Sequence, residues 1–515
     1  MKYIQYIIII SCLAFSSCKK VIDLYPESNL NTGTYYSNFA ELSAGLNGCY
    51  NGMQSPLTTE WALTEVRSDN SKQGVPGSTS AINNDLSDLD MFIPATTQQN
   101  IYNYWLNTYN NIRNANIILK NLGVNYDPAS GSISLSNITI PIADVDRKQL
   151  AGEALFIRAY HYFNLIRLYG GVFLVHTPIS ADEAKTMTRA SVADIYKLIE
   201  TDLVAAAGYM SNLKFTQITA ANKGKANSWS AKALLGKVYL TQNKKSEAIT
   251  QLQDVVTNSG FSLQSTYANV FSITNEVNSE ILFAVRFKAG GFGLGSRFGN
   301  DFGPLNSGST VINGSGQGLN TPTTEIDTLF VAGDARRAVN IAKYLPGTAS
   351  ERIYVRKYLN PVVLTNDGES DWPVIRYADV LLMLAEAQGY STSSISLINQ
   401  VRTRTGLGNL PATVNTVALF EKALTLERRL EFAFENQRWF DLVRFNKTMT
   451  TITAEQTMKD HFADEYFTHY RLYVAPAPTL AELYANTTPE HMLLPIPQRE
   501  IDTNTQLEIP QNPGY

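Results

Sequence analysis

Carboxylates and arginines recur at short spacings between residues 427 and 444, where this sequence comes closest to a catalytic pattern. Glu427, Glu431 and Glu435 follow one another at four-residue steps. A glycosidase needs two carboxyl groups on opposite sides of the scissile bond, about 5–10 Å apart. Carboxylates stacked on one helical face, each beside an arginine, cannot enclose a sugar in that way. We therefore expect a structural network of ion pairs here rather than an acid/base pair.

The arginines of this segment support that interpretation. Three opposite-charge pairs are spaced three residues apart, which is the spacing at which side chains meet on a helix. Aromatic and aliphatic neighbours place these pairs in a partly buried setting, so they would fix how helices dock. The expected members of the network are Glu427, Arg428, Glu431, Glu435, Arg438, Asp441 and Arg444.

Other patterns that carry chemistry are absent from the sequence. It has no metalloprotease His-Glu motif, Walker loop, Gly-x-Ser-x-Gly elbow or Cys-x-x-Cys pair. His461 and His469 have acidic residues between them, but they are eight residues apart and no third ligand is evident. We interpret them as surface histidines. The sequence predicts no metal site and no cofactor.

The amino terminus carries a different kind of chemical signal. Lys2 precedes an apolar run that ends at Phe15, and two serines stand directly before Cys18. Such a run is typical of a secretory signal and is too short for a membrane span. The small residues before the cysteine resemble a bacterial lipobox, which predicts removal of residues 1–17 and acylation (palmitate) of Cys18. The alternative is an ordinary signal peptide with a coincidental cysteine.

Composition narrows the class of protein. With 44% apolar and 17% charged residues, the chain is typical of a folded globular protein. A net charge of −4 gives no basic excess, so nucleic acid is not an expected partner. Loss of the signal and acylation of Cys18 would leave Cys49 alone, without a disulfide partner.

Helical periodicity recurs along the chain in pairs of segments. Apolar residues repeat at three- and four-residue steps over 101–121, 150–169, 191–208, 226–240, 247–256 and 374–404. Repeated helix pairs of about 34 residues predict a mainly α, tetratricopeptide-like scaffold, an α-α superhelix with interruptions. Residues 280–287 alternate as in a strand. Segments 70–100, 124–143, 289–320 and 449–491 are expected to be long loops or irregular.

Several of these segments also resemble one protein family. Residues 435–444 are similar to the Glu-x-x-Arg-x-x-Asp-Leu-x-Arg signature of the SusD/RagB family. Further motifs follow the family order at 154–171, 376–387, 399–406, 426–431, 493–497 and 511–515. The resemblance covers the chain from the lipobox to the last residue.

The resemblance implies a function and a place of action. Family members are non-catalytic, lipid-anchored outer-membrane proteins that bind glycans, and sometimes peptides, and pass them to a SusC-type TonB-dependent transporter. It further implies one nutrient-binding unit over 18–515, with an N-terminal part to about 280 and a C-terminal part from about 281. Lysines rather than acidic residues follow Cys18. The sequence therefore supports attachment of the protein to the membrane better than its exposure on the cell exterior.

The ligand contacts are expected on aromatic residues of loops that also carry amides, acids or arginines. Aromatic faces pack on the C–H surface of a sugar, and polar groups take its hydroxyls. Tryptophans on helical stripes, Trp105, Trp229 and Trp439, are instead expected in the core. The candidate ligand residues are Trp61, Arg67, Asp69, Asn70, Phe292, Arg297, Phe298, Asn300 and Trp372, with Phe302 in the same glycine-rich loop.

Three alternatives to glycan binding remain open from the sequence. The same architecture could bind peptides, which a blank glycan array would favour. A helical lipoprotein glycosidase would need two facing carboxylates in a cleft. A purely structural scaffold would be contradicted if deletion of the gene abolished growth on one carbon source.

Overall fold

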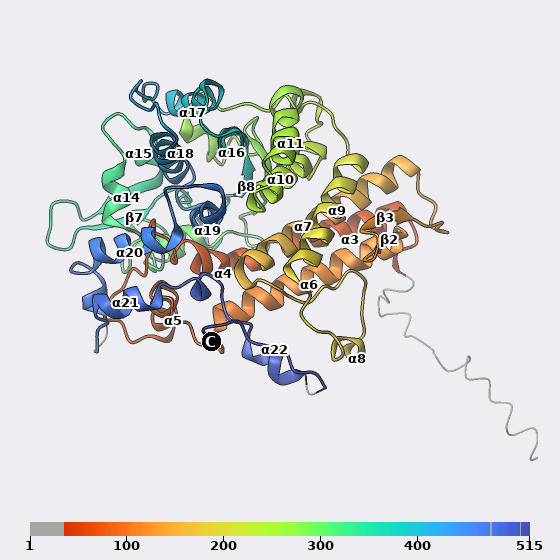
Figure 1. The fold of residues 1–515 in the computed structure, drawn as a ribbon, viewed down its shortest axis with the longest axis horizontal. Helices are drawn as coiled ribbons and strands as arrows, with labels where there is room; N and C mark the ends of the chain where they lie inside the picture. The colour runs from red at the N-terminus through yellow and green to blue at the C-terminus, as the bar shows by residue number, and fades with distance from the viewer. Residues whose placement is uncertain (1–34, 474–475, 505) are drawn as a thin grey trace, which may run out of the picture.

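The computed structural model describes residues 35–473, 476–504 and 506–515. Cys18 lies outside these ranges, so its predicted acylation stays a prediction. The described chain is mainly helical, with short two-stranded sheets between helices (Figure 1). No helix in these ranges is long and apolar enough to span a membrane.

The longer helices pack against one another largely in chain order. Contacts join α6 to α7, α7 to α9, α9 to α10, α10 to α11, α11 to α16 and α16 to α17, and Figure 1 shows this succession across the molecule. Each antiparallel pair buries its apolar face only against its neighbours, as expected for a tetratricopeptide-like scaffold. The helices are α3 (Phe39–Gly52), α4 (Gln54–Thr64), α5 (Ala81–Asp90), α6 (Gln99–Asn121), α7 (Asp144–Tyr169), α8 (Ala181–Ala184), α9 (Val192–Tyr209), α10 (Ser228–Thr241), α11 (Lys245–Asn258), α12 (Tyr267–Val270), α13 (Phe298–Phe302), α14 (Thr324–Leu329), α15 (Arg336–Asn340), α16 (Tyr377–Gln388), α17 (Thr392–Arg404), α18 (Val417–Glu431), α19 (Arg438–Thr448), α20 (Ala454–Glu465), α21 (Leu480–Asn486) and α22 (Gln498–Thr503).

Local sequence explains where these helices begin and end. The Asn227 side chain accepts hydrogen bonds from the backbone of the first turn of α10, which caps that helix. Gly170 ends α7 with a φ of 71°, a conformation that glycine adopts without steric cost. The predicted helical segments are confirmed, and Trp105, Trp229 and Trp439 are buried as expected.

The strands form four antiparallel pairs. These pairs are β1 (Ser71–Lys72) with β5 (Thr321–Pro322), β2 (Val124–Asp127) with β3 (Ser132–Leu135), β4 (Ile281–Val285) with β8 (Trp372–Arg376), and β6 (Ile341–Tyr344) with β7 (Arg352–Val355). The predicted strand at 280–287 is therefore confirmed as β4. Val374, expected on the following helix, lies instead in β8, because β4 pairs with the residues just before α16.

Several segments expected to be loops contain regular structure. Residues 70–100 include α5, residues 124–143 include the β2–β3 hairpin, and residues 449–491 include α20 and α21. The inward face of α20 carries two polar residues, His461 and Glu465, beside Met458 and Phe462, so its helical pattern is hidden in the sequence. Tertiary burial of polar groups, rather than an apolar stripe, holds such a helix in place.

Candidate functional site

The ion-pair network of residues 427–444 is present and buried. Arg428 donates to Asp441 and Asp379, and Arg444 donates to Asp441 and Glu386, with distances of 2.8–3.0 Å. The network ties α18 and α19 to α16. Burial alone would raise the pKa of Asp441, but Arg428 and Arg444 hold it well below its usual range.

Most partners in the network differ from the predicted ones. Only Asp441 and Arg444 pair at the expected three-residue spacing. Glu435 pairs with Lys357 and Arg376, and Arg438 pairs with Asp69. The prediction of a continuous helical face was wrong because α18 ends at Glu431. Phe434 and Asn436 then adopt positive φ values of 65° and 58°, which turns the chain before α19 begins.

The first group of candidate ligand residues is enclosed by this network. Arg438 donates two hydrogen bonds of 2.7 Å to the Asp69 carboxylate, and Arg429 donates one to the Asn70 side-chain oxygen at 2.9 Å. The Arg67 guanidinium lies 4.5 Å from the ring centroid of Trp439. Arg67, Asp69 and Asn70 are at most 1% exposed, which argues against direct contact with a ligand.

The aromatic candidates form one buried cluster. Phe298 packs against Trp372 at 4.5 Å between ring centroids, and Trp61 meets Phe302 edge-on at 5.4 Å. Asn300, also buried, donates to two backbone carbonyl groups of the glycine-rich loop. Trp61, Phe298, Asn300 and Trp372 are therefore core residues, because they lie on α4, α13 and β8 rather than on exposed loops.

Phe292 and Arg297 are the two candidates that remain exposed. The Phe292 side chain is 70% exposed, and Arg297 forms an ion pair with Asp301 at 3.0 Å. Both residues stay predictions as ligand contacts.

The two histidines are buried, contrary to the prediction of surface histidines. His461 Nε2 lies 2.7 Å from the Tyr470 hydroxyl, and that hydroxyl donates to Asp90 at 2.8 Å. His469 makes a similar contact with Tyr473. Burial lowers the pKa of both imidazoles. The described residues contain no group of three His, Cys, Asp or Glu side chains placed to hold a metal ion.

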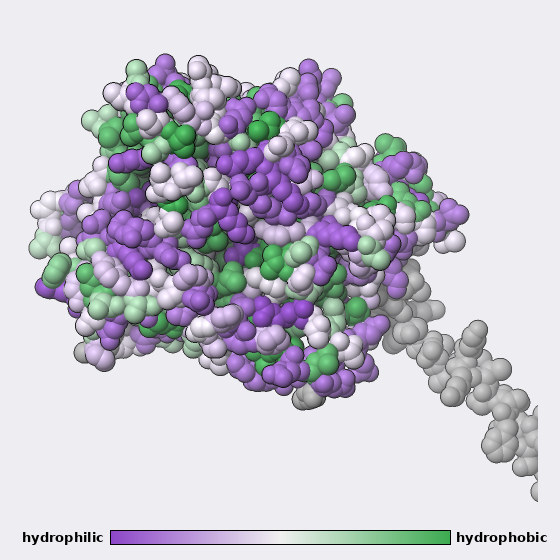
Figure 2. Space-filling view, in the orientation of Figure 1, coloured by the Kyte–Doolittle hydropathy of each residue, from purple (hydrophilic) through white to green (hydrophobic). Residues whose placement is uncertain are grey.

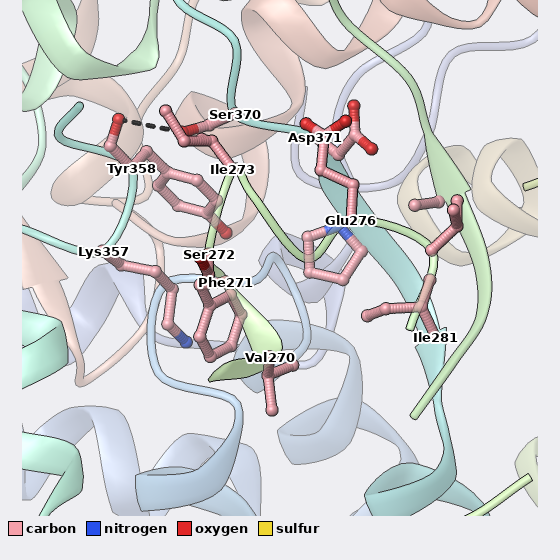
Figure 3. A pocket seen from close by; sticks show the side chains of 13 residues that line it. Val270, Phe271, Ser272, Ile273, Glu276, Ile281, Lys357, Tyr358, Ser370 and Asp371 are labelled. Carbon is pink, nitrogen blue, oxygen red and sulfur yellow. Dashed lines mark hydrogen bonds between the residues drawn. The ribbon is translucent and has the colours of Figure 1, made fainter. Parts of the chain in front are cut away.

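A pair of carboxylates does face a small pocket beside β8. Figure 3 shows Glu276 and Asp371 ending close together, away from Lys357. Both carboxylates pair with Arg286, and burial raises the pKa of Asp371 to about 7. The pocket has a volume of only about 30 Å³. That is the share of one water molecule in the liquid, so a sugar cannot enter between these acids.

A large open cavity lies between α3 and β4, and we call it the α3–β4 cleft. Its volume is about 540 Å³. This is within the range of small-molecule sites, which combine an apolar floor with a few polar groups. Its lining residues are Asn47, Gly48, Tyr50, Asn51, Met53, Gln54, Ala221, Lys223, Gly224, Lys225, Phe283, Ala284, Val285, Arg286, Phe287, Lys288 and Leu294.

The floor of the cleft is held in a fixed arrangement. The Tyr50 hydroxyl donates to Glu153 at 2.7 Å and accepts from the Ala226 backbone at 3.0 Å. Its ring packs 6.3 Å from that of Phe283 on β4. Gln54 donates to the backbone oxygen of Arg286 at 2.6 Å, which joins the start of α4 to the end of β4. The cleft is therefore formed before any ligand arrives.

Phe292 lies on a short loop at the rim of this cleft. A β-bridge between Lys288 and Leu294, both of which line the cleft, closes the base of the loop. The Asp367 carboxylate accepts hydrogen bonds from the backbones of Gly290 and Gly291 at 2.8 and 2.9 Å. These contacts hold the loop in shape and leave an aromatic ring in solvent, where a ligand can stack on it.

The other residues that line the cleft could not be predicted from the sequence. Tyr50 and Gln54 are four positions apart along the chain, but residues 221–225 and β4 join them only in the folded protein. Gly48 gave one usable signal, because an exposed glycine inside a helix is costly without a local reason. A side chain added at Gly48 would meet nothing within 4 Å.

The helix-pair scaffold and a preformed cleft with an aromatic residue at its rim define a binding protein. Comparison with known proteins agrees with this class. Residues 280–515 match the SusD family, and residues 22–240 match a family described as "Starch-binding associating with outer membrane". The chain belongs to the SusD family, whose members bind carbohydrate without catalysis, and so it is not an enzyme.

Individual relatives are distant but similar over their full length. SusD-like protein P2 of Formosa agariphila is 25% identical over 100% of both chains. A SusD-like protein of Bacteroides ovatus is 24% identical over 100% of this chain and 98% of its own. Among solved structures, a laminarin-binding SusD-like protein is 27% identical, with a TM-score of 0.74 over 93% of this chain and 100% of that one.

Proposed function

We propose that this protein is a lipid-anchored glycan-binding protein of the outer-membrane surface. It captures oligosaccharide or polysaccharide in the α3–β4 cleft and delivers it to a SusC-type TonB-dependent transporter. The observation that carries the proposal is the preformed cleft of about 540 Å³ with Phe292 at its rim. Family membership and the laminarin-binding relative support a glycan as the ligand.

The anchor and the transporter belong to the same proposal. The lipobox-like residues before Cys18 and the outer-membrane association of the matching family support a tether to that membrane. A single acyl chain binds membranes only weakly, and lipoproteins with more chains are held more firmly. The exterior orientation and the division of the chain near residue 280 also remain part of this proposal.

Replacement of Phe292 by alanine should weaken glycan binding. Loss of a stacking ring should cost about 1–2 kcal/mol, which is about a tenfold loss of affinity. A panel of soluble polysaccharides that begins with laminarin identifies a ligand by affinity electrophoresis. Isothermal titration then compares wild type with Phe292→Ala. The polysaccharide should keep its chain length after incubation with the protein.

Phe467 provides a matched control. It is 65% exposed, close to the 70% of Phe292, but it lies after α20 and away from the cleft lining. Phe467→Ala should bind with wild-type affinity. Loss of binding in Phe467→Ala, with Phe292→Ala unchanged, would move the site to another face. A protein that binds peptides but no glycan would contradict the ligand class.

A further inference from the structure

The lining of the α3–β4 cleft contains basic residues but no acidic ones. The cleft contains Lys223, Lys225, Arg286 and Lys288, and none of its lining residues is aspartate or glutamate. The whole chain, in contrast, has more acidic residues than basic ones, 46 against 42. A cleft lined by charges of one sign concentrates ions of the opposite sign.

Two of these four cations are neutralised from outside the cleft. Arg286 pairs with Glu276 at 2.7 Å and also with Asp371, and Lys288 pairs with Glu369 at 2.6 Å. None of these carboxylates lines the cleft. Arg286 and Lys288 therefore contribute hydrogen-bond donors and aliphatic stems to the cleft more than they contribute net charge.

The other two, Lys223 and Lys225, have no ion-pair partner among the described residues. Both residues are partly buried. The Lys223 ammonium group lies 4.5 Å from the ring centroid of Phe215, which limits where it can move. Glu153, the acid near Lys225, is buried and accepts hydrogen bonds from Tyr50 and Gln149, while burial raises its pKa and the charge of Lys225 lowers it. The cleft thus contains two cations that form no direct ion pair with an acid of the described residues.

The segment that carries these lysines is attached to the floor of the cleft. The backbones of Asn222 and Lys223 donate to Thr219 at 3.0 Å, which forms a turn. The backbone N–H of Ala226, the residue after Lys225, donates to the Tyr50 hydroxyl. The backbone that carries both lysines is therefore attached to the same tyrosine whose ring forms part of the floor.

The amides on the opposite wall complete a site for a charged sugar. Asn47 and Asn51 are one helical turn apart on α3 and are exposed. Amide groups exchange hydrogen bonds with hydroxyls, aromatic rings pack on C–H faces, and ammonium groups attract carboxylate or sulfate as point charges. A neutral glycan would leave the two lysines without an ion-pair partner, whereas an anionic glycan would pair with them.

We propose that the ligand of the α3–β4 cleft is an anionic glycan, a chain that carries carboxylate or sulfate groups. This inference rests on the proposed function and adds the charge class of the ligand. The anionic groups pair with Lys223 and Lys225, and the sugar ring lies over the Tyr50 side of the cleft toward Phe292.

Matched pairs of polysaccharides test the charge preference. Homogalacturonan is compared with its fully methyl-esterified form, and laminarin sulfate with laminarin, by isothermal titration in 50 mM and 500 mM NaCl. The charged member of at least one pair should bind about tenfold or more tightly at low salt. That preference should shrink at high salt, because ions screen exposed charges.

A double variant assigns the preference to the two lysines. Lys223→Ala with Lys225→Ala should remove the preference, so that the charged member of the pair binds no more tightly than the neutral one. Lys343→Ala with Lys447→Ala removes the same charge from exposed positions outside the cleft lining and should keep the preference.

The outcomes separate this inference from the proposed function. Equal or tighter binding of both neutral members by wild type would overturn the anionic class while leaving glycan binding intact. A preference that survives in the Lys223/Lys225 variant would overturn the role of the cleft lysines. Failure to bind any glycan, charged or neutral, would contradict the proposed function itself.

Discussion

Arg376→Met should lower the free energy of unfolding by about 3–5 kcal/mol, because it leaves buried carboxylates short of a positive charge. Arg376 is 1% exposed and lies at the end of β8. Its guanidinium donates to Glu280 at 2.7 Å, to Glu431 at 2.8 Å and to Glu435 at 2.8 Å. No water can replace it without rearrangement of the core. Urea unfolding followed by circular dichroism measures the change.

Two further variants make the Arg376 result interpretable. Arg376→Lys keeps the charge but loses the planar fork of donors, so its stability should fall between wild type and Arg376→Met. Lys343→Met breaks an exposed pair with Glu351 and should change stability little. An Arg376→Met variant with the wild-type urea midpoint would contradict a stabilising role for this buried network.

Glu65→Gln should make the protein more stable at pH 8 by several kcal/mol, with little difference at pH 4. Burial raises the pKa of Glu65 to about 8, although the Asn436 backbone donates to its carboxylate at 2.6 Å. In the unfolded chain this pKa is about 4.3. Folding therefore takes up a proton between these values, and the contribution of Glu65 to stability is lost as pH rises from about 4 to 8.

The pH dependence of the difference isolates Glu65 from other titrating groups. Because glutamine cannot ionise, the gap between variant and wild type should open by up to about 1.4 kcal/mol per pH unit above pH 4. Unfolding of both proteins at pH 4, 6 and 8 gives this slope. A variant that is less stable than wild type at pH 8 would mean that Glu65 is ionised and well paired in the folded protein.

Acidic residues of the network should produce the opposite trend at low pH. Burial opposes ionisation of Glu431, but Arg404, Arg376 and Arg336 lower its pKa to about 2. Its contribution is present above the unfolded pKa and is lost as pH falls from about 4.3 to 2. This opposing trend cancels in the difference between Glu65→Gln and wild type, because both proteins contain Glu431.

The helical scaffold could be predicted because its information is local. The apolar stripe over 150–169 and the glycine at its end lie within about six helical turns of one another. Helix α7 ends at Tyr169 as expected. The pair formed by Asp441 and Arg444 was predictable for the same reason. Helix α5 was not, because its buried face mixes Leu86 and Leu89 with Asn83 and Asp90.

The candidate site depended on contacts that no local pattern contains. Arg438 meets Asp69 across 369 positions of sequence, so an acid that seemed free to bind a ligand is already neutralised. Likewise, Trp61 and Trp372 satisfied the composition of a sugar platform but are needed in the core. The glycine-rich loop around Phe292 was expected to carry ligand contacts, and of its aromatic candidates only Phe292 is exposed, so its role as a contact stays a prediction.

The surface pattern explains why the cleft has to be found from geometry. In Figure 2, hydrophilic and hydrophobic residues are interspersed over the visible face. A glycan site needs both kinds of residue, so hydropathy alone does not distinguish it from the surrounding surface. The α3–β4 cleft differs from the surrounding surface in its concave shape and in the hydrogen bonds that fix its lining.

Gly48→Trp is the most direct test that the α3–β4 cleft is the binding site. Gly48 lines the cleft on an exposed face of α3, and an added side chain there would meet nothing within 4 Å. Tryptophan should fill the cleft without disturbing the fold. Gly208→Trp is the matched control, because Gly208 is also exposed, helical and free of close neighbours, but it lies on α9 outside the cleft.

The measurement is the dissociation constant of each folded variant for the polysaccharide that wild type binds. Gly48→Trp should weaken binding by at least about tenfold, whereas Gly208→Trp should bind as wild type does. A folded Gly48→Trp protein with wild-type affinity would show that glycan binds elsewhere on this scaffold.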